Sequence, residues 1–150
     1  MRPILLQGHE KPITQIKYNR EGDLLFSAAK DKDSVINVWY SSNGERLGSY
    51  NGHKGVVWCV DCNWDTTNVL SGSGDCSCRL WDFETGKQLA LLQTSSAVRT
   101  CGFDYSGHIV MFSTDKQSGF DSYLNFFDLR DSQQVKDNKP YQSIPCTDDR

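Results

Sequence analysis

The sequence predicts an all-β protein built from repeated units of four short antiparallel strands. Landmark residues recur at a nearly constant spacing: Gly8-His9 and Gly52-His53 lie 44 residues apart, and Trp39 and Trp81 lie 42 apart. A period of about 40 to 45 residues is typical of repeat architectures. The segments between the landmarks are short, rich in β-branched and aromatic residues and separated by turn residues, which favours strands over helices.

Each expected unit begins with an inner strand of six residues, and the three inner strands align without gaps: Ile13–Tyr18, Val57–Cys62 and Val98–Phe103. Second strands are expected to begin at Leu24, Val69 and Ile109, and third strands to end in an aromatic residue at Trp39, Trp81 and Phe127. Fourth strands follow the turns Asn43-Gly44 and Thr85-Gly86, where glycine supplies the positive φ of a tight hairpin. In the third unit a polar loop, Arg130–Lys139, precedes the expected fourth strand Pro140–Ile144.

These landmarks divide the chain into an outer strand of a closing unit at 1–7, three full units at 8–51, 52–92 and 93–145, and the start of a fourth at 146–150. The third unit departs from the pattern, with Gln93-Thr94 in place of Gly-His and Phe127-Asp128 in place of Trp-Asp. It also has a lengthened turn, Asp115–Asp121, and its alignment around Ser113–Asp115 is open by one residue.

Composition argues against a nucleic-acid binder acting alone and against a membrane protein. The chain has 16 Lys and Arg against 19 Asp and Glu, a net charge of -3. No segment approaches the roughly 18 apolar residues of a membrane span, and Ile4–Leu6 is too short for the core of a signal peptide. The Gly-Lys pair in Thr85–Gln88 lacks the rest of a phosphate-binding loop, so no cofactor is expected. We therefore expect a soluble intracellular protein.

Six cysteines raise the possibility of disulfides or of a zinc site. An intracellular protein keeps its thiols reduced, which argues against disulfides. The Cys59-x-x-Cys62 and Cys76-x-Cys78 spacings look like zinc-ligand pairs, but residues three apart on a strand point to opposite faces. We expect no metal site, with the cysteines serving as small residues on strands.

Four polar or aromatic positions recur in the first two units and can form one hydrogen-bond chain. The predicted structural sets are His9, Ser27, Asp31 and Trp39 in the first unit, and His53, Ser71, Asp75 and Trp81 in the second, with Asp33 an alternative to Asp31. Trp donates, Ser and His donate and accept, and Asp accepts, so each set can satisfy its buried groups. Ser, His and Asp also form hydrolase triads. That alternative requires a solvent-accessible set, and the repetition of the set and the lack of a G-x-S-x-G elbow argue against it.

A Gly-His start, an Asp in the turn and a Trp-Asp end at this period resemble the WD-repeat family, whose members form β-propellers with four strands to a blade. Several stretches are similar to one branch, the family of i subunits of eukaryotic translation initiation factor 3: Met1–Glu10, Ile13–Phe26, Val38–Tyr40, Asn43–Gly48, Ser77–Asp82, Gly86–Leu92, Ala97–Asp104 and Phe126–Arg130. Trp39-Tyr40, where a generic repeat has Trp-Asp, is particular to that branch. The resemblance implies about three four-stranded antiparallel blades, an incomplete portion of a seven-bladed propeller.

The resemblance further implies a non-catalytic scaffold subunit in the cytoplasm. Such a subunit supports recruitment of mRNA and initiator tRNA to the small ribosomal subunit through protein–protein contacts. Expected partners are other subunits of the factor, notably b and g, with no membrane and no direct sequence-specific nucleic-acid binding. Asp115–Asp121 and Arg130–Lys139 are the expected protruding contact loops. The alternative within the same fold is a signalling adaptor of the serine/threonine-kinase receptor-associated type.

Overall fold

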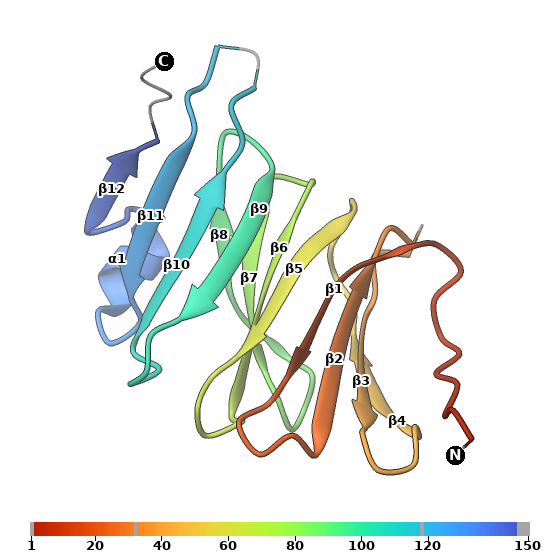
Figure 1. Cartoon of the computed structure of the whole chain (residues 1–150). Helices are drawn as coiled ribbons and strands as arrows, with labels where there is room; N and C mark the ends of the chain where they lie inside the picture. Colours follow the sequence, from red (N-terminus) through yellow and green to blue (C-terminus); the bar gives the residue numbers. More distant parts are fainter. Residues whose placement is uncertain (1, 32, 118, 147–150) are drawn as a thin grey trace.

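The computed structural model describes residues 2–31, 33–117 and 119–146, and almost all regular secondary structure in these ranges is β-strand. Three four-stranded antiparallel sheets follow one another along the chain (Figure 1). The all-β fold class is therefore confirmed. Residue 118, in the expected lengthened turn, and residues 147–150, in the expected start of a fourth unit, lie outside the described residues.

Each sheet is a meander in which consecutive strands pair. The first sheet contains β1 (Ile13–Tyr18), β2 (Leu24–Ala29), β3 (Ile36–Tyr40) and β4 (Arg46–Tyr50). The second contains β5 (Val57–Cys62), β6 (Asn68–Ser73), β7 (Ser77–Asp82) and β8 (Gln88–Gln93). The third contains β9 (Val98–Phe103), β10 (Ile109–Thr114), β11 (Tyr123–Asp128) and β12 (Gln142–Pro145).

The sheets stack face to face around their inner strands β1, β5 and β9, which lie side by side in Figure 1. One apolar core fills the space between the first and second sheets, and includes Phe26, Ile36, Val60 and Trp81. A second core lies between the second and third sheets. Burial of these side chains is the main stabilising term for the stack, at about 1.5–3 kcal/mol for each large apolar side chain.

The turn after each inner strand is fixed by one short polar side chain. Asn19 Oδ1 accepts a hydrogen bond from the amide of Leu24 at 3.1 Å, and Asp104 Oδ1 accepts one from Ile109 at 2.9 Å. Asn63 makes the equivalent contact in the second sheet. Asn and Asp favour such turns because their side chains bond to nearby backbone. These contacts explain why the three inner strands end at equivalent residues.

Two segments differ from expectation. Residues 2–9 form no strand, and Ile4–Leu6 is exposed. The assignment of residues 1–7 to the outer strand of a closing unit stays a prediction. The loop expected at Arg130–Lys139 instead contains a helix, α1 (Ser132–Asp137). Asp131 caps the amino end of α1 by accepting from the Gln133 amide, and Asn138 ends it in a left-handed conformation.

Candidate functional site

The structure brings the four predicted residues of the second sheet into one buried hydrogen-bond chain. The Trp81 indole N–H donates to Ser71 Oγ at 2.8 Å, and Ser71 Oγ lies 2.7 Å from His53 Nε2. His53 Nδ1 lies 3.0 Å from Asp75 Oδ2. The chain therefore joins the third strand, the second strand, the segment before the inner strand and the turn after β6.

The first sheet carries the same arrangement. Trp39 Nε1 donates to Ser27 Oγ at 2.8 Å, and Ser27 Oγ lies 2.7 Å from His9 Nε2. The other ring nitrogen of His9 contacts Asp31, whose second oxygen accepts the Lys11 amide at 2.8 Å. Of the two aspartates left open by the sequence, Asp31 is thus the one that contacts the ring.

Donors and acceptors in the second set match only if His53 is neutral. Trp81 donates to Ser71, Ser71 donates to His53 Nε2, and the Nδ1–H of His53 donates to Asp75, so each group uses its own polarity. A proton on Nε2 would leave the Ser71 hydroxyl proton without an acceptor. Consistently, burial lowers the pKa of His53, and the hydrogen bond to Asp75 offsets only part of this effect.

Asp75 is held as a carboxylate. Burial alone raises the pKa of a carboxyl group, but here the hydrogen bonds from His53, from the Ser77 hydroxyl and from the Lys54 amide outweigh it, and the pKa of Asp75 lies well below its usual range. A neutral imidazole hydrogen-bonded to an ionised carboxylate is therefore the stable state of this set near neutral pH.

Ser71 is not placed for attack on a substrate. It is fully buried, and His53 is 5% exposed. Its oxygen is already shared between the Trp81 indole and the His53 ring. A nucleophile needs room for a reacting atom about 3 Å away, and this set has none. The arrangement fixes strands and turns rather than supplying a reactive group.

The glycine before each histidine has a packing reason. A Cβ atom on Gly8 would lie 2.6 Å from a ring carbon of Trp39, and one on Gly52 would lie 2.9 Å from a ring carbon of Trp81. Such distances are shorter than van der Waals contact. The Gly-His pair therefore recurs because the backbone must pass directly over the tryptophan that the histidine's set anchors.

The third sheet replaces this set with an aromatic stack. Strand pairing places Phe112 opposite Cys101, as Ser71 lies opposite Val60, and Phe127 opposite Val110, as Trp81 lies opposite Val69. The Phe112 and Phe127 rings stack with centroids 5.7 Å apart and an interplanar angle of 14°. The sequence left the alignment of this unit open by one residue around Ser113–Asp115; the Ser113 side chain bonds the Thr100 hydroxyl at 2.7 Å and takes no part in the aromatic stack. Counting outward from the inner strand would have found Phe112.

The two loops expected to protrude are partly tied down. Asp115 accepts hydrogen bonds from the Arg99 guanidinium, the shortest at 2.6 Å. In the polar loop, Asn138 exchanges two hydrogen bonds with the backbone of Gln93, and Val135 packs into the core between the second and third sheets. Val135 and Asn138 therefore dock α1 onto β8, while no residue of α1 is buried; the expectation that Arg130–Lys139 is a contact loop stays a prediction.

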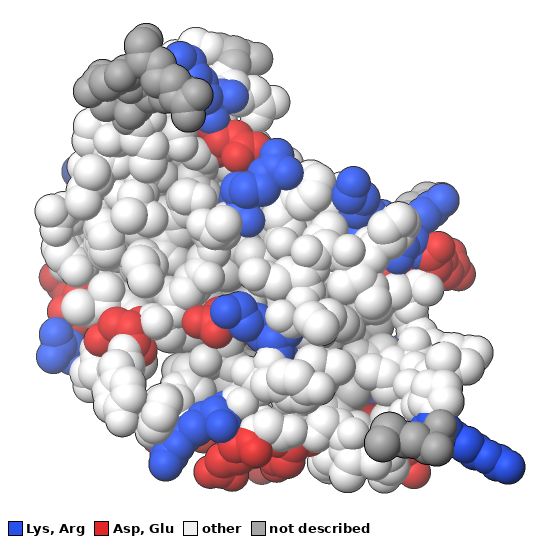
Figure 2. Space-filling view, viewed as in Figure 1, with Lys and Arg blue, Asp and Glu red and all other residues white. Residues whose placement is uncertain are grey.

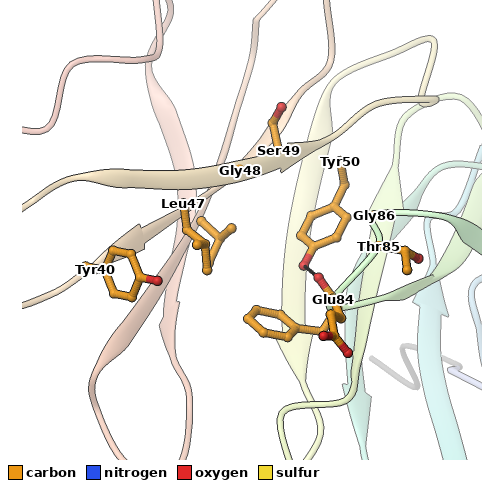
Figure 3. Close-up of a pocket in the computed structure, with 10 residues that line it drawn as sticks. Tyr40, Leu47, Gly48, Ser49, Tyr50, Glu84, Thr85 and Gly86 are labelled. Atoms are coloured by element: carbon orange, nitrogen blue, oxygen red, sulfur yellow. Dashed lines mark hydrogen bonds between the residues drawn. The ribbon is translucent and has the colours of Figure 1, made fainter.

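An open groove lies at the outer side of the first and second sheets (Figure 3). Its lining residues are Val38, Tyr40, Leu47, Gly48, Ser49, Tyr50, Phe83, Glu84, Thr85 and Gly86. Figure 3 shows Tyr40 and Leu47 on one side of the opening and Tyr50 with Glu84 on the other. The Tyr50 hydroxyl donates to the carbonyl of Phe83 at 3.0 Å, which closes the inner end of the groove.

Charged side chains are dispersed over the face that carries the inner strands. Figure 2 shows Lys and Arg scattered among Asp and Glu there, with no continuous basic area on the described part of this face. Binding of nucleic acid through phosphates depends on such an area. In the described ranges, no helix is long and apolar enough to cross a membrane.

The cysteines do not gather with other ligands around a metal position. Within the described residues, no group of three or more His, Cys, Asp or Glu side chains could hold an ion. Cys59 and Cys78 are buried among apolar strand residues, and burial raises the pKa of the Cys62 thiol to about 12. Thiols with raised pKa values are poor nucleophiles and poor ligands.

Comparison with known proteins identifies the family. The family model EIF3I matches residues 1–150. A zebrafish (Danio rerio) protein named eukaryotic translation initiation factor 3 subunit I is 73% identical over all 150 residues, and the human (Homo sapiens) protein of that name is 69% identical. This chain is covered completely in both alignments but spans 46% of each relative.

A solved structure shows the same fold. The crystal structure of the RRP9 WD40 repeats superposes with a TM-score of 0.76 at 21% identity, and the superposition covers 93% of this chain and 40% of that one. At that identity the likeness concerns the fold alone. The three sheets are therefore WD40-type propeller blades. The EIF3I family model matches all 150 residues, which shows that the chain belongs to the family of eukaryotic translation initiation factor 3 subunit I.

Proposed function

We propose that this chain is part of a non-catalytic scaffold subunit of eukaryotic translation initiation factor 3. The observation that carries the proposal is the family match over all 150 residues, with 69–73% identity to relatives bearing that name. The subunit would support recruitment of mRNA and initiator tRNA to the small ribosomal subunit in the cytoplasm. It would act through protein–protein contacts within the complex.

The buried hydrogen-bond sets support a non-catalytic role. In both sheets the serine oxygen is occupied by a tryptophan donor and a histidine ring, and the aspartate is occupied by backbone amides. These contacts rigidify the blades and leave their outer surfaces for partners. The dispersed charge supports contact with the ribosome through other subunits rather than through direct sequence-specific nucleic-acid binding.

The expected direct partners are the b and g subunits of the factor. The test is affinity purification of the full-length protein carrying a tag, at moderate salt, with mass spectrometry of the bound proteins. We expect the b and g subunits together with others of the factor. Recovery of receptor kinases without any subunit of the factor would overturn the proposal in favour of the signalling-adaptor alternative.

A further inference from the structure

The open groove between the first and second sheets has an equivalent between the second and third sheets, and that equivalent is filled by the chain itself. Repeat positions match by strand pairing: Val38 opposite Gly48 corresponds to Leu80 opposite Ala90. Likewise Ile36 opposite Tyr50 corresponds to Cys78 opposite Leu92. Phe83 corresponds to Leu129, because their amides donate to the carbonyls of Thr67 and His108, the residues that precede β6 and β10. We call the space between the second and third sheets at these positions the filled groove.

Helix α1 occupies the filled groove. Val135 of α1 packs into the cluster that contains Leu80, Leu92, Ala90 and Leu129, which are the counterparts of residues lining the open groove. The helix contacts both β8 and β11, the two strands that border this groove. The protein therefore shows what kind of object fits such a groove: a short helix that inserts one branched aliphatic side chain.

Three sequence differences distinguish the open groove from the filled groove, and the first two leave it open. The segment joining β7 and β8 is the short turn Phe83–Lys87, whereas the segment joining β11 and β12 is long enough to carry α1. A Cβ atom on Gly48 would meet no other atom within 4 Å, so the space above β4 is empty. Glycine within a strand often marks a place where another chain approaches closely.

The third difference is Tyr40, which stands where the second sheet has Asp82, opposite the first residue of the second strand. Tyr40 is 39% exposed and Leu47, on the same rim, is 43% exposed. An aromatic ring in place of a carboxylate makes this rim apolar, and exposed tyrosine beside an apolar pocket is typical of protein contact sites. The apolar lining residue Val38, the Tyr40 and Leu47 rim and the lack of a side chain at Gly48 all favour an apolar occupant.

We propose that the open groove binds a short amphipathic helix of another subunit, which inserts one Val, Ile or Leu side chain over Gly48, as Val135 of α1 packs against the core cluster that the equivalent residue Ala90 also joins. Exposed Glu84 at the mouth favours a Lys or Arg next to that side chain, as Lys136 follows Val135 in α1. This inference rests on the proposed function for the identity of the partner. It adds the site, the helical form of the ligand and the side chain that the site accepts.

The test is site-specific photo-crosslinking in the assembled complex. The full-length protein carries p-benzoylphenylalanine in place of Tyr40 or, as the matched control, in place of Leu89. Leu89 is the bulge residue of β8 that corresponds to Leu47 of β4, and it is 52% exposed outside the open groove. After irradiation, the cross-linked peptides are identified by mass spectrometry.

We expect the Tyr40 probe to react with a helical segment of another subunit that carries an aliphatic residue at the point of attachment. Gly48→Leu, which fills the space from this side, should reduce the yield at least about tenfold, since burying one branched aliphatic side chain corresponds to about one to two orders of magnitude in affinity. The Leu89 probe should give the same products with and without Gly48→Leu. A second pair, Leu47→Glu against Leu89→Glu, should reduce the Tyr40 cross-link only in the first case.

The outcomes separate the two proposals. If no subunit of the factor purifies with the unsubstituted protein, the proposed function fails. If the complex purifies intact but the Tyr40 probe stays unreacted, reacts only with its own chain or with an extended segment, or reacts equally well in the Gly48→Leu protein, the groove proposal is overturned. The thermal unfolding midpoint of the Gly48→Leu protein should equal that of the unsubstituted protein, which excludes misfolding as the cause of a lost cross-link.

Discussion

Removal of one buried hydroxyl should reveal how much the hydrogen-bond set contributes to the second blade. Ser71→Ala takes away the acceptor of the Trp81 indole N–H and the donor to His53 Nε2, which lie 2.8 and 2.7 Å from the hydroxyl oxygen. Both groups are buried, and each unsatisfied buried group costs about 1–3 kcal/mol. We therefore expect Ser71→Ala to lower the free energy of unfolding by about 2–4 kcal/mol.

The matched control is Ser113→Ala on the third blade. Ser113 also lies on a second strand, but its hydroxyl bonds only to exposed Thr100 and leaves no buried group unpaired. Loss of such a solvent-accessible hydrogen bond should cost less than about 1 kcal/mol. Both proteins are compared by urea unfolding at full length, with the urea dependence checked to be the same.

A double substitution tests the physical reason. Trp81→Phe removes the indole donor and costs stability by leaving a cavity. Without the indole donor, Ser71→Ala leaves only His53 Nε2 without a hydrogen-bond partner, instead of two groups. The double variant should therefore be more stable than the sum of the two single effects predicts, by about 1 kcal/mol or more. Equal destabilisation by Ser71→Ala and Ser113→Ala, or full additivity with Trp81→Phe, would refute this account of the set.

Three further predictions concern pH, the docked helix and the turn surface. The pKa of His53 is lowered in the folded state, so as the pH falls through about 6.5 the unfolded chain binds a proton that the folded state does not bind. The free energy of unfolding should therefore decrease from pH 7 to pH 5.5. In urea unfolding, His53→Gln should make this decrease smaller. Asn138→Gly keeps the left-handed end of α1 but removes both hydrogen bonds to Gln93. Hydrogen exchange of the Gln93 amide should therefore become about tenfold faster or more. An unchanged exchange rate would show that α1 docks without these bonds. Trp64→Ala removes a ring that lies against Tyr105, with centroids 4.5 Å apart and an interplanar angle of 40°, and should cost about 1 kcal/mol in thermal unfolding; no change would mean that this exposed aromatic pair contributes nothing.

The strands were predictable because the same pattern of short apolar segments and turn residues occurs three times along the chain. All three inner strands begin and end at the expected residues. The second strands begin at Leu24, Asn68 and Ile109, each at the expected residue or one residue before it. The residues of the two hydrogen-bond sets could be named from spacing because each has a different donor or acceptor role.

Helix α1 and the grooves were not predictable in the same way. Only Val135 of the six residues in α1 is apolar, so periodicity carries no helical signal, although the Asp131 and Asn138 caps could have suggested one. The alignment of the third unit stayed open by one residue around Ser113–Asp115, since strand register rather than residue type decides which side chain faces the next sheet. The open groove depends on residues of two different blades, such as Gly48 and the Phe83–Lys87 turn, and only the strand pairing in three dimensions shows that they line one space.

The third blade meets the same mechanical requirement by different chemistry. In the first two blades a buried histidine ties the segment before the inner strand to the turn after the second strand. In the third, the Ser96 hydroxyl donates to the carbonyl of Asp115 at 2.7 Å, and Arg99 pairs with the Asp115 carboxylate. Arg99 is about half exposed, and exposed ion pairs contribute only about 0–1 kcal/mol. The ion pair in this blade is therefore weaker and more salt-sensitive than the buried histidine contacts of the first two blades.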